Sequence, residues 1–81
     1  DLARFAGRYA SPFGPLEVTT DGRRLVARLL DQPSSEMLPL SDTKFLMESM
    51  HVPIEFVSDT NGIVTHAVVD AGGEIKLPRL P

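Results

Sequence analysis

The chain has 81 residues, which is enough for one domain. Its net charge of -3 argues against nucleic acid as a partner, because phosphate backbones attract clustered Lys and Arg. It contains no cysteine, which excludes disulfides and thiolate metal sites, and no apolar run approaches the roughly 20 residues of a membrane-spanning helix.

The chain begins at Asp1 rather than Met, so we expect residues 1–81 to be a single domain that belongs to a larger chain. Residues 2–9 contain the only candidate for a helical turn, since Leu2, Phe5 and Tyr9 are spaced to share one helical face. Gly7 would end this turn, and the first strand would then begin near Tyr9. A turn at residues 11–15 follows, because it contains two prolines that cannot donate to a sheet.

The clearest pattern in the chain is a β-hairpin over residues 16–30. Leu16 and Val18 alternate with polar residues, and a second alternating run follows at residues 25–30. Asp21-Gly22 separates the two runs, and Gly allows the positive φ that such a turn needs.

Five further short strands and their turns follow in the remaining sequence. We predict strands at residues 36–40, 44–48, around 54–56, 63–69 and 74–77, separated by runs of Asp, Ser, Thr, Asn, Gly and Pro. Turn signals therefore recur about every 10 residues, which is typical of an antiparallel barrel or sandwich. The connections are too short for the crossovers of a parallel sheet.

The sequence thus predicts an all-β fold, a small antiparallel up-and-down barrel of about eight short strands with one short N-terminal helical turn. Strands of about five residues make a narrow barrel that side chains fill. The predicted core consists of Leu16, Val18, Leu25, Ala27, Phe45, Ile54, Phe56, Ala67 and Val69.

The ionisable residues are not spaced as a catalytic or metal centre. The aspartates lie beside Gly, Pro, Ser or Thr in predicted turns, where their carboxylates accept backbone hydrogen bonds. The glutamates are scattered along solvated strand faces, and His51 and His66 lack the spacing of metal ligands. We therefore predict no catalytic residue, no metal and no cofactor.

One short motif has a possible catalytic interpretation. Residues 41–44 match Ser-x-x-Lys, the nucleophile motif of serine β-lactamases and penicillin-binding proteins. In those enzymes a helical turn brings the Lys back onto the Ser, whereas here the motif leads from a turn into a strand. The partner motifs of those enzymes are absent, so we interpret Ser41 as a turn residue.

Several apolar residues fall on strand faces that should point outward. A contiguous apolar patch on a surface marks a contact with a partner. The candidate docking surface consists of Val26, Leu30, Leu38, Leu46 and Val68.

The order of motifs resembles a known domain. The features are LARFAGRY at residues 2–9, LEVT at 16–19, DGRRLVA at 21–27, TKF at 43–45, IEFV at 54–57 and IKLPR at 75–79. Together they are similar to the small lipocalin-like domain of unknown function that ends bacterial serine hydrolases, namely β-lactamase-like proteins, esterases and D-aminopeptidase relatives. The resemblance covers nearly the whole chain.

This resemblance implies an eight-stranded barrel that follows a catalytic domain, in which the upstream domain carries the catalytic serine. We therefore expect a non-catalytic accessory domain that packs on the catalytic domain of its parent chain or on a second copy of itself. The resemblance slightly favours a periplasmic or secreted location. The alternative is a lipocalin-like module for small molecules, which requires an internal cavity of at least about 300 Å³.

Overall fold

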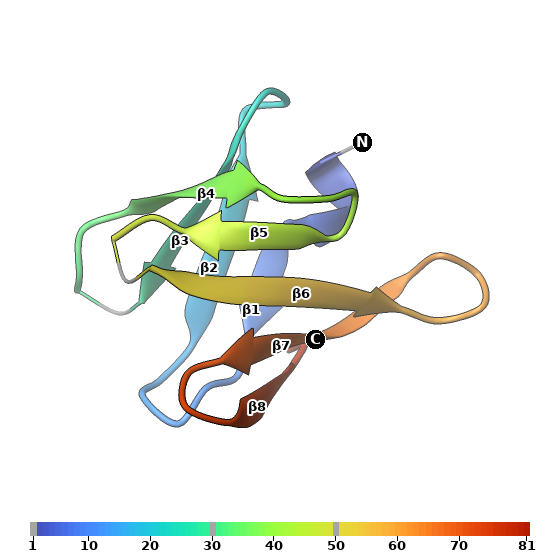
Figure 1. Cartoon of the computed structure of the whole chain (residues 1–81). Coiled ribbons are helices and arrows are strands. Elements are labelled where there is room, and N and C mark those ends of the chain that lie inside the picture. Colours follow the sequence, from blue (N-terminus) through green and yellow to red (C-terminus); the bar gives the residue numbers. More distant parts are fainter. Residues whose placement is uncertain (1, 30, 50) are drawn as a thin grey trace.

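The structure, a computed structural model, describes residues 2–29, 31–49 and 51–81. In these residues one 3-10 turn, η1 (Leu2–Phe5), precedes an eight-stranded antiparallel sheet in which each strand pairs with the next (Figure 1). The strands are β1 (Gly7–Tyr9), β2 (Leu16–Thr20), β3 (Leu25–Leu29), β4 (Ser35–Pro39), β5 (Lys44–Met47), β6 (Val52–Ser58), β7 (Val64–Asp70) and β8 (Glu74–Pro78). The predicted all-β up-and-down barrel with one short N-terminal turn is confirmed.

The two ends of the chain close the sheet into a barrel. Tyr9 forms an isolated antiparallel bridge with Arg79, just after β8. On either side of it, the Ala10 N–H donates to the Pro78 carbonyl at 2.8 Å, and the Leu80 N–H donates to the Arg8 carbonyl at 2.7 Å. These bonds satisfy backbone groups that an open sheet would leave at its edges.

The strands alternate between the barrel interior and its outer surface. In β2, Leu16 and Val18 are buried while Glu17 and Thr19 are exposed, and Leu25 and Ala27 of the neighbouring strand β3 are buried in the same alternating way. A two-residue period of this kind puts one face of each strand inside. The pattern is broken by a register shift between Val57 and Ser58, beyond which the β6–β7 hairpin projects from the barrel (Figure 1).

Aromatic rings fill one end of the interior. The ring of Phe5, carried by η1, stacks on Phe56 with the ring centroids 4.7 Å apart and meets Phe45 edge-on at 5.5 Å. Tyr9 lies 5.6 Å from Phe56, and its hydroxyl donates to the Phe5 carbonyl at 2.8 Å. The 3-10 turn therefore closes this end of the barrel with the side chain of Phe5.

Eight of the nine predicted core residues are buried, and the ninth, Val69, is half-buried and packs against the core. Val69 lies nearer the other end of the barrel, where the interior is less completely filled. The buried cluster also contains residues that we did not predict, namely Phe5, Tyr9, Met37, Met47, Val64 and Leu77.

Candidate functional site

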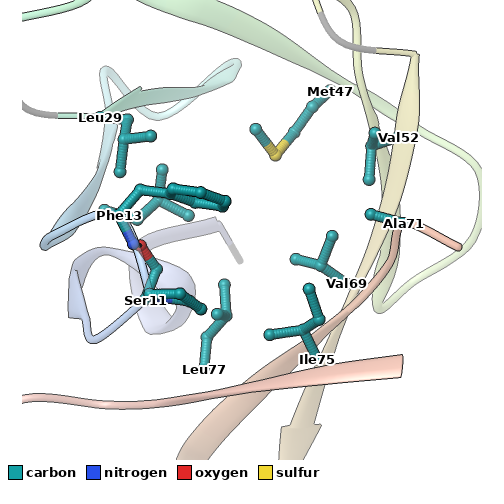
Figure 2. A pocket seen from close by; sticks show the side chains of 11 residues that line it. Ser11, Phe13, Leu29, Met47, Val52, Val69, Ala71, Ile75 and Leu77 are labelled. Carbon is teal, nitrogen blue, oxygen red and sulfur yellow. Dashed lines mark hydrogen bonds between the residues drawn. The ribbon is translucent and has the colours of Figure 1, made fainter. Parts of the chain in front are cut away.

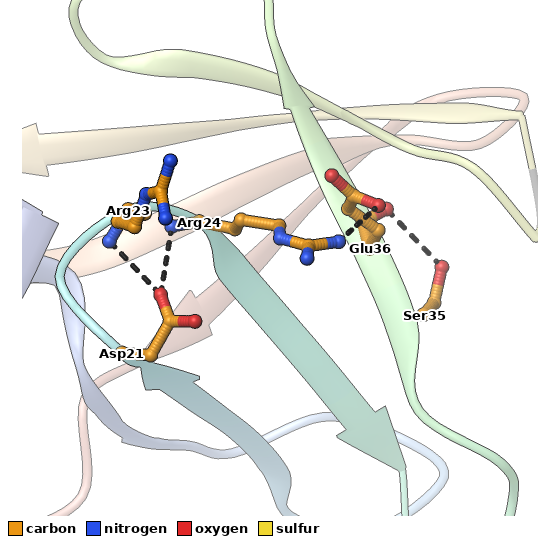
Figure 3. Close-up of polar contacts among 5 residues, drawn as sticks. All are labelled: Asp21, Arg23, Arg24, Ser35 and Glu36. Atoms are coloured by element: carbon orange, nitrogen blue, oxygen red, sulfur yellow. Dashed lines mark hydrogen bonds and ion pairs between the residues drawn. The ribbon is translucent and has the colours of Figure 1, made fainter.

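Two of the turn aspartates bind the backbone of their own turns. The Asp21 carboxylate accepts hydrogen bonds from the N–H groups of Arg23 and Arg24 at 2.9 and 3.2 Å (Figure 3). The Asp59 carboxylate accepts from Asn61 and Ile63 at 2.8 and 3.0 Å. The backbone N–H bonds lower the pKa of Asp21, because they stabilise its charged form.

Ser41 is bound to the backbone of the turn between β4 and β5. Its hydroxyl oxygen accepts from the Thr43 N–H at 3.4 Å and from the Lys44 N–H at 3.1 Å. The Ser41 N–H donates to the Lys44 carbonyl at 3.1 Å. The Ser-x-x-Lys match thus lies in a hydrogen-bonded turn at the start of β5, with no helical segment between its two ends.

The histidines lie in different parts of the fold. His51 is exposed in the turn before β6 and has a positive φ of 53°, whereas His66 is half-buried on β7, where its Nδ1 lies 2.9 Å from the Thr65 hydroxyl. No group of three or more metal-ligating His, Cys, Asp or Glu side chains occurs in the described parts of the chain. In those parts, too, no helix has the length and apolar character to cross a membrane.

The arginines of the central hairpin and the one near the C-terminus have different environments. Arg24, just before β3, pairs with Glu36 of β4 at 3.4 Å, with both side chains largely exposed (Figure 3). The guanidinium of Arg79 instead donates to the Ala6 carbonyl at 2.6 Å and the Val64 carbonyl at 3.1 Å. Arg79 therefore ties the N-terminal segment to β7, a role that no local sequence pattern indicated.

Two of the predicted docking residues lie directly side by side. Leu38 of β4 pairs with Leu46 of β5, and Leu46 pairs on its other side with Pro53 of β6. All three side chains are half-buried and face outward. We call this row of Leu38, Leu46 and Pro53 the outer strip.

The other predicted docking residues are separated from the outer strip by polar neighbours. Val26 pairs with Thr19 and Glu36. Val68 likewise pairs with two charged residues, Glu55 and Lys76. Leu30 falls outside the described residues.

The end of the barrel opposite η1 contains an apolar recess. It has a volume of about 90 Å³, opens to solvent, and its surface is wholly apolar. Figure 2 shows side chains converging on it from the strands and the β1–β2 turn. This mouth recess is lined by Ser11, Pro12, Phe13, Leu16, Leu29, Met47, Val52, Val69, Ala71, Ile75 and Leu77.

Phe13 forms one wall of the mouth recess although its side chain is 68% exposed. It is held there by a tight turn, in which the Ser11 hydroxyl accepts from the Phe13 N–H at 3.1 Å and donates to the Gly14 carbonyl. The Gly14 N–H in turn donates to the Ser11 carbonyl at 3.1 Å. An exposed aromatic ring on a fixed turn is a preformed contact surface.

A wider hollow of about 640 Å³ adjoins the mouth recess and shares with it Phe13, Leu16, Leu29 and Met47. Its remaining lining is partly polar, and includes Gln32, Ser34, Ser35 and Ser49. Ser35 is buried, and its hydroxyl accepts from the Ser49 N–H at 3.1 Å. The mouth thus combines a small apolar recess with a larger hollow that has hydroxyl and amide groups along one side.

The sequence did not indicate the mouth recess, because its walls come from turns and strand ends that are far apart in the chain. The one local signal was Phe13. This large aromatic residue lies between Pro12 and the Gly14-Pro15 pair, in a turn that cannot bury its side chain.

The fold defines the chain as a small closed up-and-down β-barrel. Comparison of the chain with known protein families, with curated proteins and with solved structures gave no significant match.

Proposed function

We propose that this barrel is a non-catalytic accessory domain that packs on the catalytic domain of a β-lactamase-like serine hydrolase. The order of motifs along the chain supports this proposal through its resemblance to the domains that accompany such enzymes. The observation that carries it is the outer strip, in which Leu38, Leu46 and Pro53 lie in register across three neighbouring strands. Paired apolar side chains on an outward face gain free energy when a partner covers them.

The chemistry of the barrel is consistent with a supporting role. The Ser41 hydroxyl and the carboxylates of Asp21 and Asp59 are engaged by backbone N–H groups of their own turns. A general base must lie within hydrogen-bond reach of the nucleophile that it activates. The hydrogen bonds of Ser41 instead join it to the backbone of residues 43 and 44.

Covalent labelling tests the absence of a catalytic serine in the barrel. A penicillin and a fluorophosphonate are added separately to the 81-residue chain and to the native polypeptide in which it occurs. We expect label only on the native polypeptide, at a serine outside residues 1–81. Label at Ser41 would make the barrel itself an enzyme, and absence of label from both samples would argue against a hydrolase partner.

The contact is tested with Leu46→Glu, which places a charge in the middle of the outer strip. We expect this variant to weaken association between the barrel and the catalytic domain, measured by sedimentation or by limited proteolysis, while its circular dichroism stays unchanged. Ile63→Glu is the matched control, because Ile63 is a 59% exposed apolar residue at the β6–β7 turn. If both variants associate equally with the catalytic domain, or if the barrel associates with a second copy of itself through the outer strip, the proposed partner is contradicted.

A further inference from the structure

One buried hydroxyl group lies beside the hollow that adjoins the mouth recess. Ser35 begins β4, where it belongs to the same buried, inward-facing series as Met37. Ser35 is 6% exposed, and among the described residues it is the one buried position whose side chain is not hydrophobic. It also lines the hollow, so a polar atom is present where an otherwise apolar interior opens to solvent.

The hydrogen bonds of the Ser35 hydroxyl are unequal. Its oxygen accepts from the Ser49 N–H at 3.1 Å, whereas its O–H donates to the Glu36 carbonyl only over 3.5 Å (Figure 3). Hydroxyl donors usually lie about 2.7–2.8 Å from an oxygen acceptor. The Glu36 carbonyl also accepts the Glu48 N–H at 3.1 Å, so it keeps a partner without Ser35. The Ser35 O–H can therefore exchange a long bond for a shorter one to an acceptor in the hollow.

The lining of the mouth carries no formal charge. Among the described residues, none that lines the mouth recess or the hollow is Asp, Glu, Lys, Arg or His. Burying a charge without a partner of opposite charge costs far more free energy than burying a neutral polar group that is hydrogen-bonded. The mouth therefore favours an uncharged ligand over a cation and over an anion alike.

We propose that the mouth of the barrel binds a small neutral molecule made of an alkyl chain and a carbonyl group, such as an alkyl ketone or ester. The end of the alkyl chain occupies the mouth recess, between Phe13, Met47 and Ile75 (Figure 2). The carbonyl oxygen lies in the hollow and accepts from the Ser35 hydroxyl. This site is separate from the outer strip, and it does not depend on the proposed accessory function.

The volumes of the two spaces set the shape of the ligand. A dry apolar cavity of about 150 Å³ is large enough to hold benzene, so the mouth recess, at about 90 Å³, admits the end of an unbranched chain rather than a ring. The hollow, at about 640 Å³, has the size of a small-molecule site, in which apolar walls surround a few polar groups that orient the ligand. Leu16 and Leu29 line both spaces and join them, and Ser35 supplies the orienting group.

The test compares four probes with the same six-carbon chain, namely hexane, hexan-2-one, hexanoate and hexylammonium, in nuclear magnetic resonance titrations of the 81-residue chain. We expect amide shifts confined to the mouth, at residues such as Phe13, Leu29 and Ser49. Hexan-2-one should bind at least roughly tenfold more tightly than either ion, because the lining offers no opposite charge. Absence of shifts at the mouth, or a charged probe that binds as tightly as hexan-2-one, would overturn the proposal.

Ser35→Ala tests the hydrogen bond that orients the ligand. This variant should bind hexan-2-one roughly fivefold more weakly, which corresponds to one ordinary hydrogen bond, and should bind hexane as the original chain does. Ser58→Ala is the matched control and should leave the binding of both probes unchanged, because Ser58 lies at the opposite end of β6 from the recess residue Val52. If Ser35→Ala keeps full affinity for hexan-2-one, the proposal is wrong.

Phe13→Ser tests the mouth recess without changing the barrel interior, so it keeps the proposal testable even if Ser35→Ala does not fold. Phe13 is 68% exposed, and its loss should weaken the binding of both hexane and hexan-2-one. Ile63→Ser, at a 59% exposed position in the β6–β7 turn, should leave both affinities unchanged. Unchanged affinities in Phe13→Ser would show that the alkyl chain does not enter the recess, which contradicts the proposed site.

Discussion

Gly7 lies so close to the guanidinium of Arg79 that a Cβ atom at residue 7 would come within 3.0 Å of Nε and 3.2 Å of Nη2. The φ angle of Gly7 is 153°, a value that residues with a Cβ rarely adopt. The Gly-x-Tyr sequence at residues 7–9 therefore has a structural explanation. Gly7 lets the arginine reach the Ala6 carbonyl, and Tyr9 forms the backbone bridge with the same arginine.

Gly7→Ala should destabilise the barrel by about 2–3 kcal/mol, because it adds a steric clash to the backbone strain. Arg79 cannot move aside without losing its bonds to the Ala6 and Val64 carbonyls. Gly22→Ala is the control, since Gly22 also has a positive φ of 96°, but a Cβ added to it would have no neighbouring atom within 4 Å. Urea unfolding of both variants measures the difference, and equal losses would show that the clash has no effect.

Arg79→Met should open the barrel at the junction between its two ends. It removes two charge-assisted hydrogen bonds and leaves the Ala6 and Val64 carbonyls without this donor, at a cost of about 2–3 kcal/mol. Hydrogen exchange should accelerate most in β1 and β8. Arg23→Met, at an exposed turn position, should leave exchange unchanged, and uniform acceleration over all strands would contradict a local role for Arg79.

Tyr9 should make the barrel sensitive to alkali. Burial raises the pKa of Tyr9 above its ordinary value of 10.0, and the positive charge of Arg79 only partly opposes this effect. Because the folded state holds the phenolic proton more tightly, the resulting stability is present in full below pH 10.0 and is lost as the pH rises through the raised pKa. Tyr9 is the only tyrosine and the chain has no tryptophan, so tyrosinate absorbance reports this titration directly.

Tyr9→Phe separates the ionisation of Tyr9 from other alkaline effects. At neutral pH the variant should lose about 1–2 kcal/mol, because the Phe5 carbonyl loses the hydroxyl that donates to it at 2.8 Å. Its stability should then decline less steeply above pH 10.0 than that of the original chain. A tyrosinate midpoint at or below 10.0 in the folded protein would contradict the burial of this hydroxyl.

Asp21 should stabilise the β2–β3 turn only while it is charged. The N–H groups of Arg23 and Arg24 lower the pKa of Asp21. The contribution of Asp21 to the stability of the fold is therefore present at a pH above its ordinary pKa of 3.8, and it is lost as the pH falls through the lowered pKa. The stability difference between the original chain and Asp21→Ala should therefore shrink in acid. Asp42→Ala, at an exposed position in another turn, should show a smaller difference at neutral pH in the same unfolding series.

The local pattern of the sequence was sufficient for most of the sheet. Alternation in residues 16–29 placed Leu16, Val18, Leu25 and Ala27 inside, and the structure has them there. It was not sufficient for Phe5, because only the closed barrel brings a 3-10 turn over the end of the interior. The same is true of Arg79, whose partners Ala6 and Val64 lie 73 and 15 residues away.

The candidate sites also differ in how far the sequence could predict them. Leu38 and Leu46 could be predicted as an outward pair from the alternation of two adjacent strands, whereas Pro53 was missed because a proline usually indicates an interruption of a strand. The mouth recess could not be predicted, since its lining combines the β1–β2 and β7–β8 turns with residues of six different strands.

The bonds between residues 8–10 and 78–80 have a consequence for folding. The first and last strands can pair only after the intervening strands have brought them together, and contacts between residues so distant in sequence slow the folding of a domain. Until that step is complete, the sheet presents two unpaired edges that can join other chains. The final residues of this chain therefore protect it against aggregation, and a truncation before Arg79 would expose that hazard in the native protein.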